Sequence, residues 1–420
     1  MTETVFTYGA PALKFGAGAS AEIGHDLAAT GARRVLLVTD AGVAATGHPA
    51  RIADQMVAAG LEVTTYDGVR IEPTDASMVD AIGFARDAGP FDAVVAVGGG
   101  SAIDTAKAVD LLLTNPGELL DYVNPPVGGG QAPGQPLLPL VAVPTTTGTG
   151  SESTTVCVLD VLEQHVKTGI SHPRLRPTAA VVDPELTVSQ PAMVTAAAGM
   201  DVLCHALESY TARWFADFPA KRPEQRVPYC GANPIADVWS ERSLAVLAGS
   251  FRAAVRDGGD REAREQMALA ATFAGLGFGN AGVHVPHANA YPIAGRVQDF
   301  RPEGYPDDEA IVPHGMAVSM TAPAAFGFTF EAAPERHLRA ARLLDPGATG
   351  DGPETLPRVL VALMRDIGLP NGLAELGYGD SDVGDLVAGS LQQQRLLATA
   401  PREVTGDDLA GVFRGSMELW

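Results

Sequence analysis

The sequence is poor in cysteine and lysine and contains no long apolar run. Its three cysteines, Cys157, Cys204 and Cys230, are widely spaced, which excludes the disulfide framework of a small secreted domain. We expect reduced, mostly buried thiols. No apolar run approaches the roughly 20 residues that a membrane helix needs, and the N-terminal residues lack the features of a secretory signal. These absences predict a soluble, cytoplasmic protein with no membrane partner.

Basic residues are also scarce, with 29 lysines and arginines against 50 acidic residues and a formal net charge of −21. This balance excludes a general nucleic-acid binder, which would carry a basic stripe. An anionic substrate would therefore need local positive charge to overcome the background field. The remaining composition is that of a globular enzyme, with 46% apolar residues. A chain of 420 residues is long enough for two domains, and the sequence leaves a homo-oligomer open.

Strand and helix patterns alternate through the first half of the chain. Short apolar strands are expected at 33–42, 61–69, 91–100 and 139–150, with helical spacing in the segments between the first three. Such alternation predicts a parallel sheet with helices on both faces, here an α/β dinucleotide-binding domain over residues 1–190. Alanine-rich helical patterns then predict an all-helical domain over residues 191–420. Segments 215–234 and 296–315, rich in proline and charge, are expected to be ordered loops.

Two glycine-rich segments follow expected strands. Gly98, Gly99 and Gly100 close one strand and open a helix, where backbone N–H groups and the helix N-terminus can receive a pyrophosphate. Ser101 is placed to cap this helix or to touch phosphate. The spacing is not GxGxxG, so the usual dinucleotide fingerprint is absent and a plain tight turn remains an equal alternative.

The second segment, PTTTGTGSE at 144–152, favours the dinucleotide interpretation. Its threonines offer hydroxyl and amide donors at the carboxyl edge of the sheet, where ligands bind. Asp40 ends the first strand and could accept a hydrogen bond from an adenosine ribose, which would favour NAD over NADP. A turn or helix cap is an equally good explanation of Asp40.

One carboxylate and three imidazoles form a candidate metal shell. Asp201 and His205 lie four residues apart and so share a helix face. Such a pair alone would more often be a simple hydrogen bond. His287 and His314 change this balance, because both lie beside Pro or Gly in segments whose weak helical periodicity indicates loops, and histidines in loops often serve function. Zn²⁺ and Fe²⁺ both suit this shell and leave room for a substrate oxygen. His284 is a further candidate, although a packing or supporting role is the better explanation.

Taken together, these motifs resemble the iron-containing alcohol dehydrogenases over essentially the whole chain. The resemblance rests on FGAGA near Phe15, LLVTD, GGGSAIDTAK, PTTTGTGSE, GMDVLCHALESY and the two downstream histidine segments. LLDYVNPPVG, the insertion before GANPIADVW, GFGNAGVH and PREVTGDDLAGVF are most similar to the hydroxyacid–oxoacid transhydrogenase branch. The family implies an α/β domain followed by an all-helical metal-binding domain, an architecture shared with dehydroquinate synthase.

The resemblance also implies roles for individual residues. The metal ligands would be Asp201, His205, His287 and His314, holding Fe²⁺ in preference to Zn²⁺. The NAD contacts would come from the two glycine-rich segments and their neighbours: Asp40, Gly98, Gly99, Gly100, Ser101, Asp104, Thr145, Thr146, Thr149 and Lys167. Many family members carry a histidine four residues after the third ligand, where this chain has Tyr291. We therefore take Tyr291, with His284, as the candidate proton-transfer residues.

The implied reaction is hydride transfer through bound NAD from 4-hydroxybutyrate to 2-oxoglutarate, both small molecules with carboxylates. Because the chain is acidic, we expect a basic anchor, with Arg226 first and Arg222 second, in segment 215–234. A solvated surface loop is an equal alternative there. Three other functions remain open: an alcohol dehydrogenase that releases NADH, a lyase like dehydroquinate synthase, and a non-catalytic protein that binds metal and NAD.

Overall fold

The structure, a computed structural model, describes residues 2–164, 166–305 and 310–420 and divides into two compact units. The sheet unit comprises residues 10–146 and 150–189, and the helical unit comprises the chain up to Gly9, residues 147–149 and residues 190–420. The first residues thus group with the helical unit, and the expected domain bounds of 1–190 and 191–420 stay predictions. The first residues join the helical unit because the Gly9 N–H donates to Asn280 Oδ1 at 2.8 Å and Asn280 Nδ2 donates to the Gly9 carbonyl at 3.0 Å.

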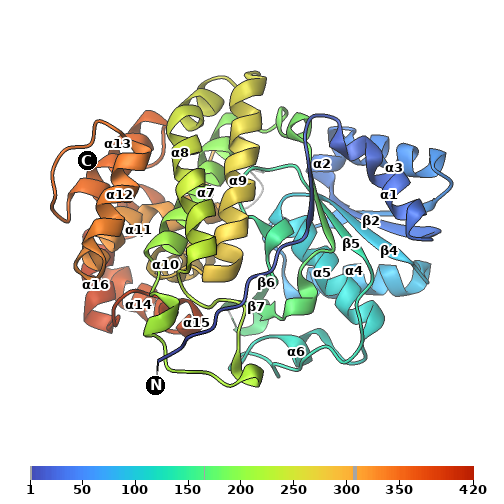
Figure 1. Cartoon of the computed structure of the whole chain (residues 1–420), viewed down its shortest axis with the longest axis horizontal. Helices are drawn as coiled ribbons and strands as arrows, with labels where there is room; N and C mark the ends of the chain where they lie inside the picture. Colours follow the sequence, from blue (N-terminus) through green and yellow to red (C-terminus); the bar gives the residue numbers. More distant parts are fainter. Residues whose placement is uncertain (1, 165, 306–309) are drawn as a thin grey trace. The chain divides into compact units, whose positions relative to one another are not determined.

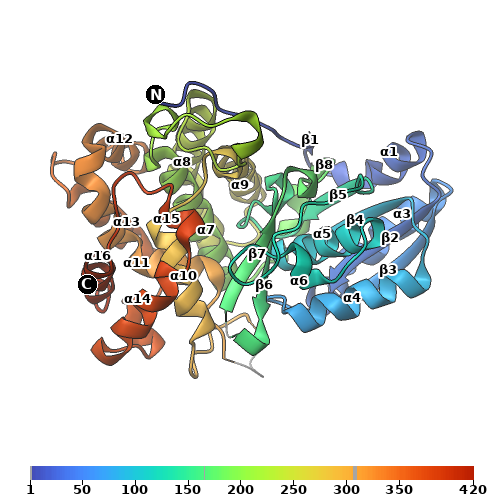
Figure 2. The ribbon, with the colours of Figure 1, turned by 90° about the horizontal axis from the view of Figure 1, so that it is seen from below.

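The sheet unit is built on six strands whose neighbours are all parallel. Figure 2 shows their order across the sheet. In that order they are β1 (Ala12–Phe15), β8 (Ala179–Val182), β5 (Leu140–Pro144), β4 (Ala93–Gly98), β2 (Arg34–Asp40) and β3 (Glu62–Val69). The parallel sheet is confirmed. β1 and β8 were not predicted, because strands of four residues are too short to show a clear period.

Alternating side chains of the strands serve two separate cores. Val35 and Leu37 of β2 belong to one apolar cluster, and Leu36 and Val38 belong to the other. Helices α1 (Ile23–Ala29) and α3 (His48–Ala58) cover the first face, and α4 (Asp75–Ala88) and α5 (Gly100–Thr114) cover the second (Figure 1). Both faces of the central strands β2, β4 and β5 are therefore buried, as the alternation of strand and helix patterns predicted. Two short helices complete this unit, α2 (Ala41–Ala45) and α6 (Leu119–Tyr122).

An antiparallel hairpin, which was not predicted, is formed by β6 (Val156–Val161) and β7 (Val166–Ser171). Cys157, Leu159 and Val161 point into the core, whereas Val158 and Asp160 are half-buried. The period of two is present in the burial of β6, but it spans only six residues, and Val156 and Val158 make the other side apolar as well.

The helical unit contains α7 to α16, which share one large apolar core. In chain order they are α7 (Ala192–Thr211), α8 (Pro234–Arg256), α9 (Arg261–Ala281), α10 (Val285–Gly295), α11 (His314–Thr329), α12 (Pro334–Leu344), α13 (Thr355–Asp366), α14 (Val383–Leu391), α15 (Gln394–Leu397) and α16 (Gly406–Arg414). Figure 1 shows α7, α8 and α9 side by side. Segment 215–233 forms only short 3₁₀ turns and irregular chain, as expected. Of the other expected loop, residues 306–309 lie outside the described residues, and its last two residues begin α11.

No single helix in the part of the chain that the structure describes is long and apolar enough to cross a membrane. Helices α9 and α10 reach the length and apolar composition of a membrane span only when they are taken together, and they meet at a bend of 102°.

Candidate functional site

Helix α7 carries three polar side chains on one buried face. Asp201, His205 and Glu208 follow one another at spacings of four and three residues, which align them along one side of a helix. All three are buried, with at most 3% of each residue exposed. Gly199, also on α7, allows α8 to pack closely against this helix, because a Cβ at Gly199 would lie 2.2 Å from the Phe251 ring on α8.

A second glycine brings His314 to this face. Gly315, in the first turn of α11, packs so tightly on α7 that a Cβ would lie 2.0 Å from the Ala197 carbonyl oxygen and 2.8 Å from Asp201 Cβ. Only glycine fits this approach without displacing a helix. The residue before it, His314, is thereby held with its Nε2 3.9 Å from Asp201 Oδ1.

Asp201, His287 and His314 form the group best suited to hold a metal ion. Each offers one ligand atom, and these atoms all lie within 4.8 Å of one another. The Nε2 of His287 is 3.4 Å from Asp201 Oδ1. His205 adjoins the group, with its Nε2 3.7 Å from the same oxygen and its ring stacked on Phe278 at a centroid distance of 3.7 Å. The structure thus brings together all four predicted ligands.

Two atoms of this group fit a metal for a second reason. Asp201 Oδ1 and His287 Nε2 are buried, and apart from each other at 3.4 Å neither has a hydrogen-bond partner among the described residues. A buried polar atom without a partner is costly, so a bound ion would satisfy both. One carboxylate oxygen and several imidazole nitrogens form a donor set that suits a divalent transition metal.

Burial and mutual charge set the protonation of the group. Burial lowers the pKa of His287, but the carboxylates of Glu208 and Asp201 outweigh this and raise it to about 9. Burial lowers the pKa of His205 to about 3. Burial raises the pKa of Asp201, but the three neighbouring histidines bring it well below its usual value. Without metal, the His287 ring is therefore protonated on both nitrogens at neutral pH.

Helices α10 and α11 correct one expectation. His287 lies within the first turn of α10, and His314 is the first residue of α11, so neither lies in a loop. Both helices are buried almost all round, and a helix with no solvated face shows no amphipathic period. The missing periodicity was therefore a sign of burial.

Glu208 is the buried residue that sequence reasoning missed. Its Oε1 lies 2.6 Å from His287 Nδ1, and its Oε2 accepts hydrogen bonds from the backbone N–H groups of His284 at 2.6 Å and His287 at 3.4 Å. A usable signal was present, because Glu208 lies seven residues after Asp201 and so on the same helix face.

The two candidate proton-transfer residues differ in their surroundings. His284 is fully buried, its Nε2 is 3.0 Å from Thr211 Oγ1, and burial lowers its pKa to about 4. Its burial and its contact with Thr211 favour a supporting role, and the catalytic role of His284 stays a prediction. Tyr291 is 9% exposed, and its ring stands perpendicular to that of His314 at a centroid distance of 6.3 Å. It remains the candidate.

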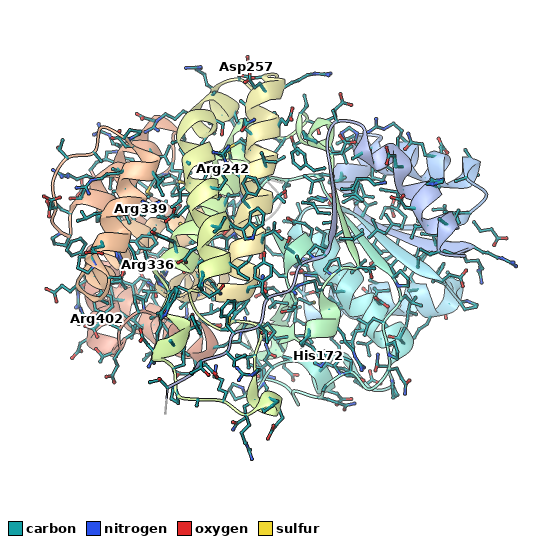
Figure 3. The ribbon with its side chains drawn as sticks, in the orientation of Figure 1. His172, Arg242, Asp257, Arg336, Arg339 and Arg402 are labelled. Carbon is teal, nitrogen blue, oxygen red and sulfur yellow. The ribbon has the colours of Figure 1, made fainter. Side chains whose placement is uncertain are left out.

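Arginines on α12 hold the end of α7 (Figure 3). The Nε of Arg336 donates to the carbonyl oxygen of Tyr210 at 2.5 Å, and its Nη2 pairs with Asp237 at 2.6 Å. Arg339 forms a two-pronged pair with Glu241, which also accepts from the Tyr210 hydroxyl at 2.8 Å. A cation at the C-terminal carbonyls of a helix is favourable, so these contacts fix the helix that carries Asp201 and Glu208.

The glycine turn of the sheet unit lies between β4 and α5. A Cβ on Gly98 would lie 2.6 Å from that of Ala102, so the turn requires glycine there. Gly99 is the N-cap of α5 and provides no side-chain cap. Gly99 and Gly100 are half-buried, which leaves the first backbone N–H groups of a fifteen-residue helix suited to a phosphate. The expected turn and helix start are confirmed.

Asp40 and two threonines lie near this turn. A Cβ on Gly98 would be 3.5 Å from Asp40 Oδ2, and one on Gly99 would be 3.3 Å from Thr146 Oγ1. Asp40 Oδ1 also caps α2 by accepting from the Val43 N–H at 2.9 Å. The hydroxyl of Thr145 is buried and has no hydrogen-bond partner among the described residues. Asp40, Thr145 and Thr146 are therefore suited to contact a dinucleotide at this turn. Thr149, also expected to contact the cofactor, belongs to the helical unit.

Three other predicted cofactor residues have partners within the sheet unit. Asp104 accepts from Ser151 Oγ and from the Val158 N–H, and it pairs with the fully buried Lys107 at 3.3 Å. Its carboxylate therefore ties α5 to β6. Ser101 does not cap α5; its hydroxyl accepts from the Glu72 N–H at 3.2 Å. Lys167 pairs with Glu72 and, at 3.6 Å, with Asp160. Their cofactor roles stay predictions.

The arginines expected to anchor substrate have other partners. Arg226 donates to Glu3 Oε2 at 3.1 Å and to the Val5 carbonyl at 2.8 Å. Arg222 is 73% exposed in its side chain and pairs with Glu224 at 3.1 Å. Among the contacts of the described residues, none joins either arginine to the metal group. Arg226 instead fastens the N-terminal segment onto segment 215–233. Its anchoring role stays a prediction that these contacts do not support.

We therefore expect Arg226→Ala to lower the Tm and to leave kcat/KM for hydroxyacids within about twofold of wild type, because it removes a fold contact and no substrate contact. Arg222→Ala, a control on the exposed neighbour, should change neither quantity. A loss of kcat/KM of about tenfold or more in Arg226→Ala at unchanged Tm would restore the anchoring role. Differential scanning calorimetry and steady-state kinetics check both arms.

With this geometry established, similarity to known proteins decides the family. The profile of "Iron-containing alcohol dehydrogenase" matches residues 10–184, and that of "Fe-containing alcohol dehydrogenase family, C-terminal" matches residues 224–417. The chain belongs to the iron-containing alcohol dehydrogenase family. It is an oxidoreductase of that family, with a sheet domain followed by a helical domain. The family model match covers both parts of the chain, so the resemblance seen in the motifs is confirmed.

Relatives within the family are similar over their whole length. The mitochondrial hydroxyacid-oxoacid transhydrogenase of Xenopus tropicalis is 44% identical over all of this chain and 92% of its own. The crystal structure of a 1,3-propanediol oxidoreductase matches with a TM-score of 0.86 at 31% identity, covering 98% of this chain and all of the other. Sulfoacetaldehyde reductase from Bifidobacterium kashiwanohense, in complex with NAD⁺, matches with a TM-score of 0.82 at 28% identity over 99% of both chains. Because the Xenopus relative is mitochondrial, a cytoplasmic location is not confirmed.

Proposed function

We propose that this enzyme is a hydroxyacid–oxoacid transhydrogenase. It would move a hydride from a hydroxyacid such as 4-hydroxybutyrate to a 2-oxoacid such as 2-oxoglutarate through NAD that stays bound. The observation that carries the proposal is the 44% identity to such a transhydrogenase over the full chain. The metal group alone cannot carry it, because a metal beside a nicotinamide serves many alcohol dehydrogenases equally well.

In this proposal residues 1–190 bind NAD and residues 191–420 bind the metal, Fe²⁺ in preference to Zn²⁺. Asp201, His205, His287 and His314 would hold a divalent metal, which when bound lowers the pKa of a substrate hydroxyl and polarises a carbonyl. The turn at Gly99 would receive the pyrophosphate on the first N–H groups of α5. The NAD⁺-bound relative supports this cofactor.

The proposed reaction has two half-steps, oxidation of the hydroxyacid and reduction of the 2-oxoacid. The hydroxyacid loses its hydroxyl proton and gives a hydride from the same carbon to nicotinamide C4, leaving an aldehyde acid and NADH. The 2-oxoacid then takes that hydride and a proton to become a 2-hydroxyacid, which restores NAD⁺. Tyr291, beside His314, is proposed to carry the proton in both directions. A cytoplasmic location remains our prediction for this reaction.

The proposal is tested by anaerobic incubation of the Fe²⁺-loaded protein with 4-hydroxybutyrate deuterated at C4. With 2-oxoglutarate and no added NAD, we expect 2-hydroxyglutarate carrying deuterium at C2, measured by mass spectrometry. Excess unlabelled NADH in solution should not dilute the label if the cofactor stays bound. Product that forms only with added NAD, with diluted label, would refute retention of NADH. Asp201→Asn should form no product in any arm.

An alcohol dehydrogenase that releases NADH each turnover is the second candidate. The similarity to a 1,3-propanediol oxidoreductase at 31% identity favours it. In the same incubation, this activity would accumulate NADH with a simple diol and added NAD, with no need for an oxoacid. The family match favours the transhydrogenase and the alcohol dehydrogenase over a lyase and over a non-catalytic protein.

Asp40 should make the enzyme prefer NAD over NADP, because its carboxylate beside the glycine turn would repel a 2′-phosphate. Asp40→Asn keeps a good helix cap and removes the charge, so it should narrow the ratio of the Kd values for NADPH and NADH by about tenfold. Asp40→Gly should narrow the ratio too but also lower the Tm, because α2 loses its side-chain cap. Tighter binding of NADPH than of NADH by the wild type would refute this role. Fluorescence titration with each cofactor measures the ratio.

A further inference from the structure

Helix α10 carries a metal ligand but has no cap of its own. Its N-cap residue is His284, whose side chain accepts no hydrogen bond from the first turn. The first N–H groups of a helix need acceptors, and when they are buried this need is strong. The residues from Val285 to Ile293 are all buried, so water cannot meet the need throughout this turn.

Glu208 supplies the missing acceptor from another helix. Its Oε2 accepts from the backbone N–H of His284 at 2.6 Å and, more weakly, from that of His287 at 3.4 Å. A carboxylate at a helix N-terminus also interacts favourably with the helix dipole. Glu208 is fully buried, so its carboxylate depends on such protein donors in place of water.

The other oxygen of the same carboxylate contacts the ligand ring. Glu208 Oε1 lies 2.6 Å from His287 Nδ1. Because an ionised carboxylate only accepts hydrogen bonds, Nδ1 must carry a proton. When the ring gives up its second proton to bind a metal, the lone pair is therefore on Nε2, the atom that faces Asp201 Oδ1 at 3.4 Å.

We propose that Glu208 is the positioning residue of the metal centre, because one carboxylate oxygen caps α10 and the other fixes the tautomer and orientation of His287. The two tasks are coupled, since His287 lies in the turn that is capped. This inference rests on the metal-dependent function proposed above and extends it to a residue that touches no substrate. A carboxylate that holds a ligating histidine is a general way to raise metal affinity.

The test compares three variants of the full-length protein. Glu208→Gln keeps the shape but has one accepting oxygen, so its amide NH₂ must face a donor on one side. Glu208→Asp keeps the charge but is one methylene shorter and cannot reach both groups. Asn233→Ala is the matched control, because it removes the buried cap of α8, where Asn233 Oδ1 accepts from the N–H groups of Ile235 and Ala236.

Zn²⁺ affinity, measured by chelator competition, is the first readout. We expect both Glu208 variants to bind Zn²⁺ about 10–100-fold more weakly than wild type, with Asn233→Ala within about twofold. Hydrogen–deuterium exchange of the metal-free protein is the second. The peptide spanning residues 283–291 should exchange faster than in the wild type in both Glu208 variants. In Asn233→Ala its exchange should equal that of the wild type.

Wild-type Zn²⁺ affinity in Glu208→Asp would overturn the proposal, because charge alone would then suffice. Unchanged exchange in 283–291 for both Glu208 variants would also overturn it. If Glu208→Gln does not fold, Glu208→Asp carries the test. Neither readout requires hydride transfer. The deuterium experiment can therefore refute the proposed reaction while the role of Glu208 stands. In the same way, these two readouts can refute the role of Glu208 while the reaction stands.

Discussion

Replacement of His287 by alanine is expected to lower metal affinity and hydride transfer by at least about 100-fold. The change deletes one of the three ligand atoms that lie within 4.8 Å of one another, and loss of even a supporting contact costs about 10–100-fold. It also leaves Asp201 and Glu208 as buried carboxylates without their shared partner. His314→Ala should act in the same direction. Metal content by plasma mass spectrometry and the deuterium-transfer assay give the two readouts.

The matched control for this prediction is His337→Ala. His337 is fully buried in the same unit, on α12, and its Nε2 lies 3.0 Å from Thr329 Oγ1, so it is outside the metal group. Its removal should lower the Tm but keep the metal. Full metal content and activity in both His287→Ala and His314→Ala would contradict the assigned metal centre.

Metal affinity is expected to rise with pH, by about tenfold per unit between pH 7 and pH 9. The pKa of His287 in the metal-free protein is raised to about 9 by its two carboxylate neighbours, after burial has lowered it. Below that pH the ring is protonated on both nitrogens, and an incoming metal must displace the proton on Nε2. The proton displaced from His287 contributes about tenfold per pH unit, and this contribution should vanish above pH 9.

Three titratable neighbours of His287 do not change their charge between pH 7 and pH 9. Burial lowers the pKa of His205 to about 3, so this ring stays neutral across the range. The pKa of Asp201 and that of Glu208 both lie below their usual values, so both carboxylates stay ionised. Zn²⁺ titrations in buffered chelator at half-unit steps of pH provide the measurement. An affinity that does not change from pH 7 to pH 9 would show that no proton is displaced and that His287 is neutral in the metal-free protein.

Sequence patterns were sufficient where the deciding interaction is local. The spacing of Asp201 and His205 placed both on one helix face, and α7 bears this out. Apolar strands alternating with helices predicted a parallel sheet, because burial of both faces leaves a direct mark on each strand. The glycine turn before α5 was also legible, since Gly98 is required there by the Cβ of Ala102, four residues away.

Patterns were misleading where burial is complete. The segments around His287 and His314 have no amphipathic period, and we took that for loop structure. Both residues lie in helices, α10 and α11, whose surroundings are apolar on nearly every side. The contacts of Arg226 could not be foreseen for a related reason. A basic side chain in a proline-rich segment offers a charge, but its partner Glu3 lies 223 residues away in the chain.

By itself, the sequence determined the chemistry available to this protein: a carboxylate and imidazoles for a metal, glycine turns for a phosphate, and a sheet followed by helices. These features depend on residue types and on spacings of a few residues, which local periodicity records. Only the tertiary structure decided how those groups are held. Glu208 meets His287 across 79 residues of chain, and Gly315 meets α7 across more than 110. Contacts between separate helices depend on how whole faces pack, and no local pattern encodes that packing.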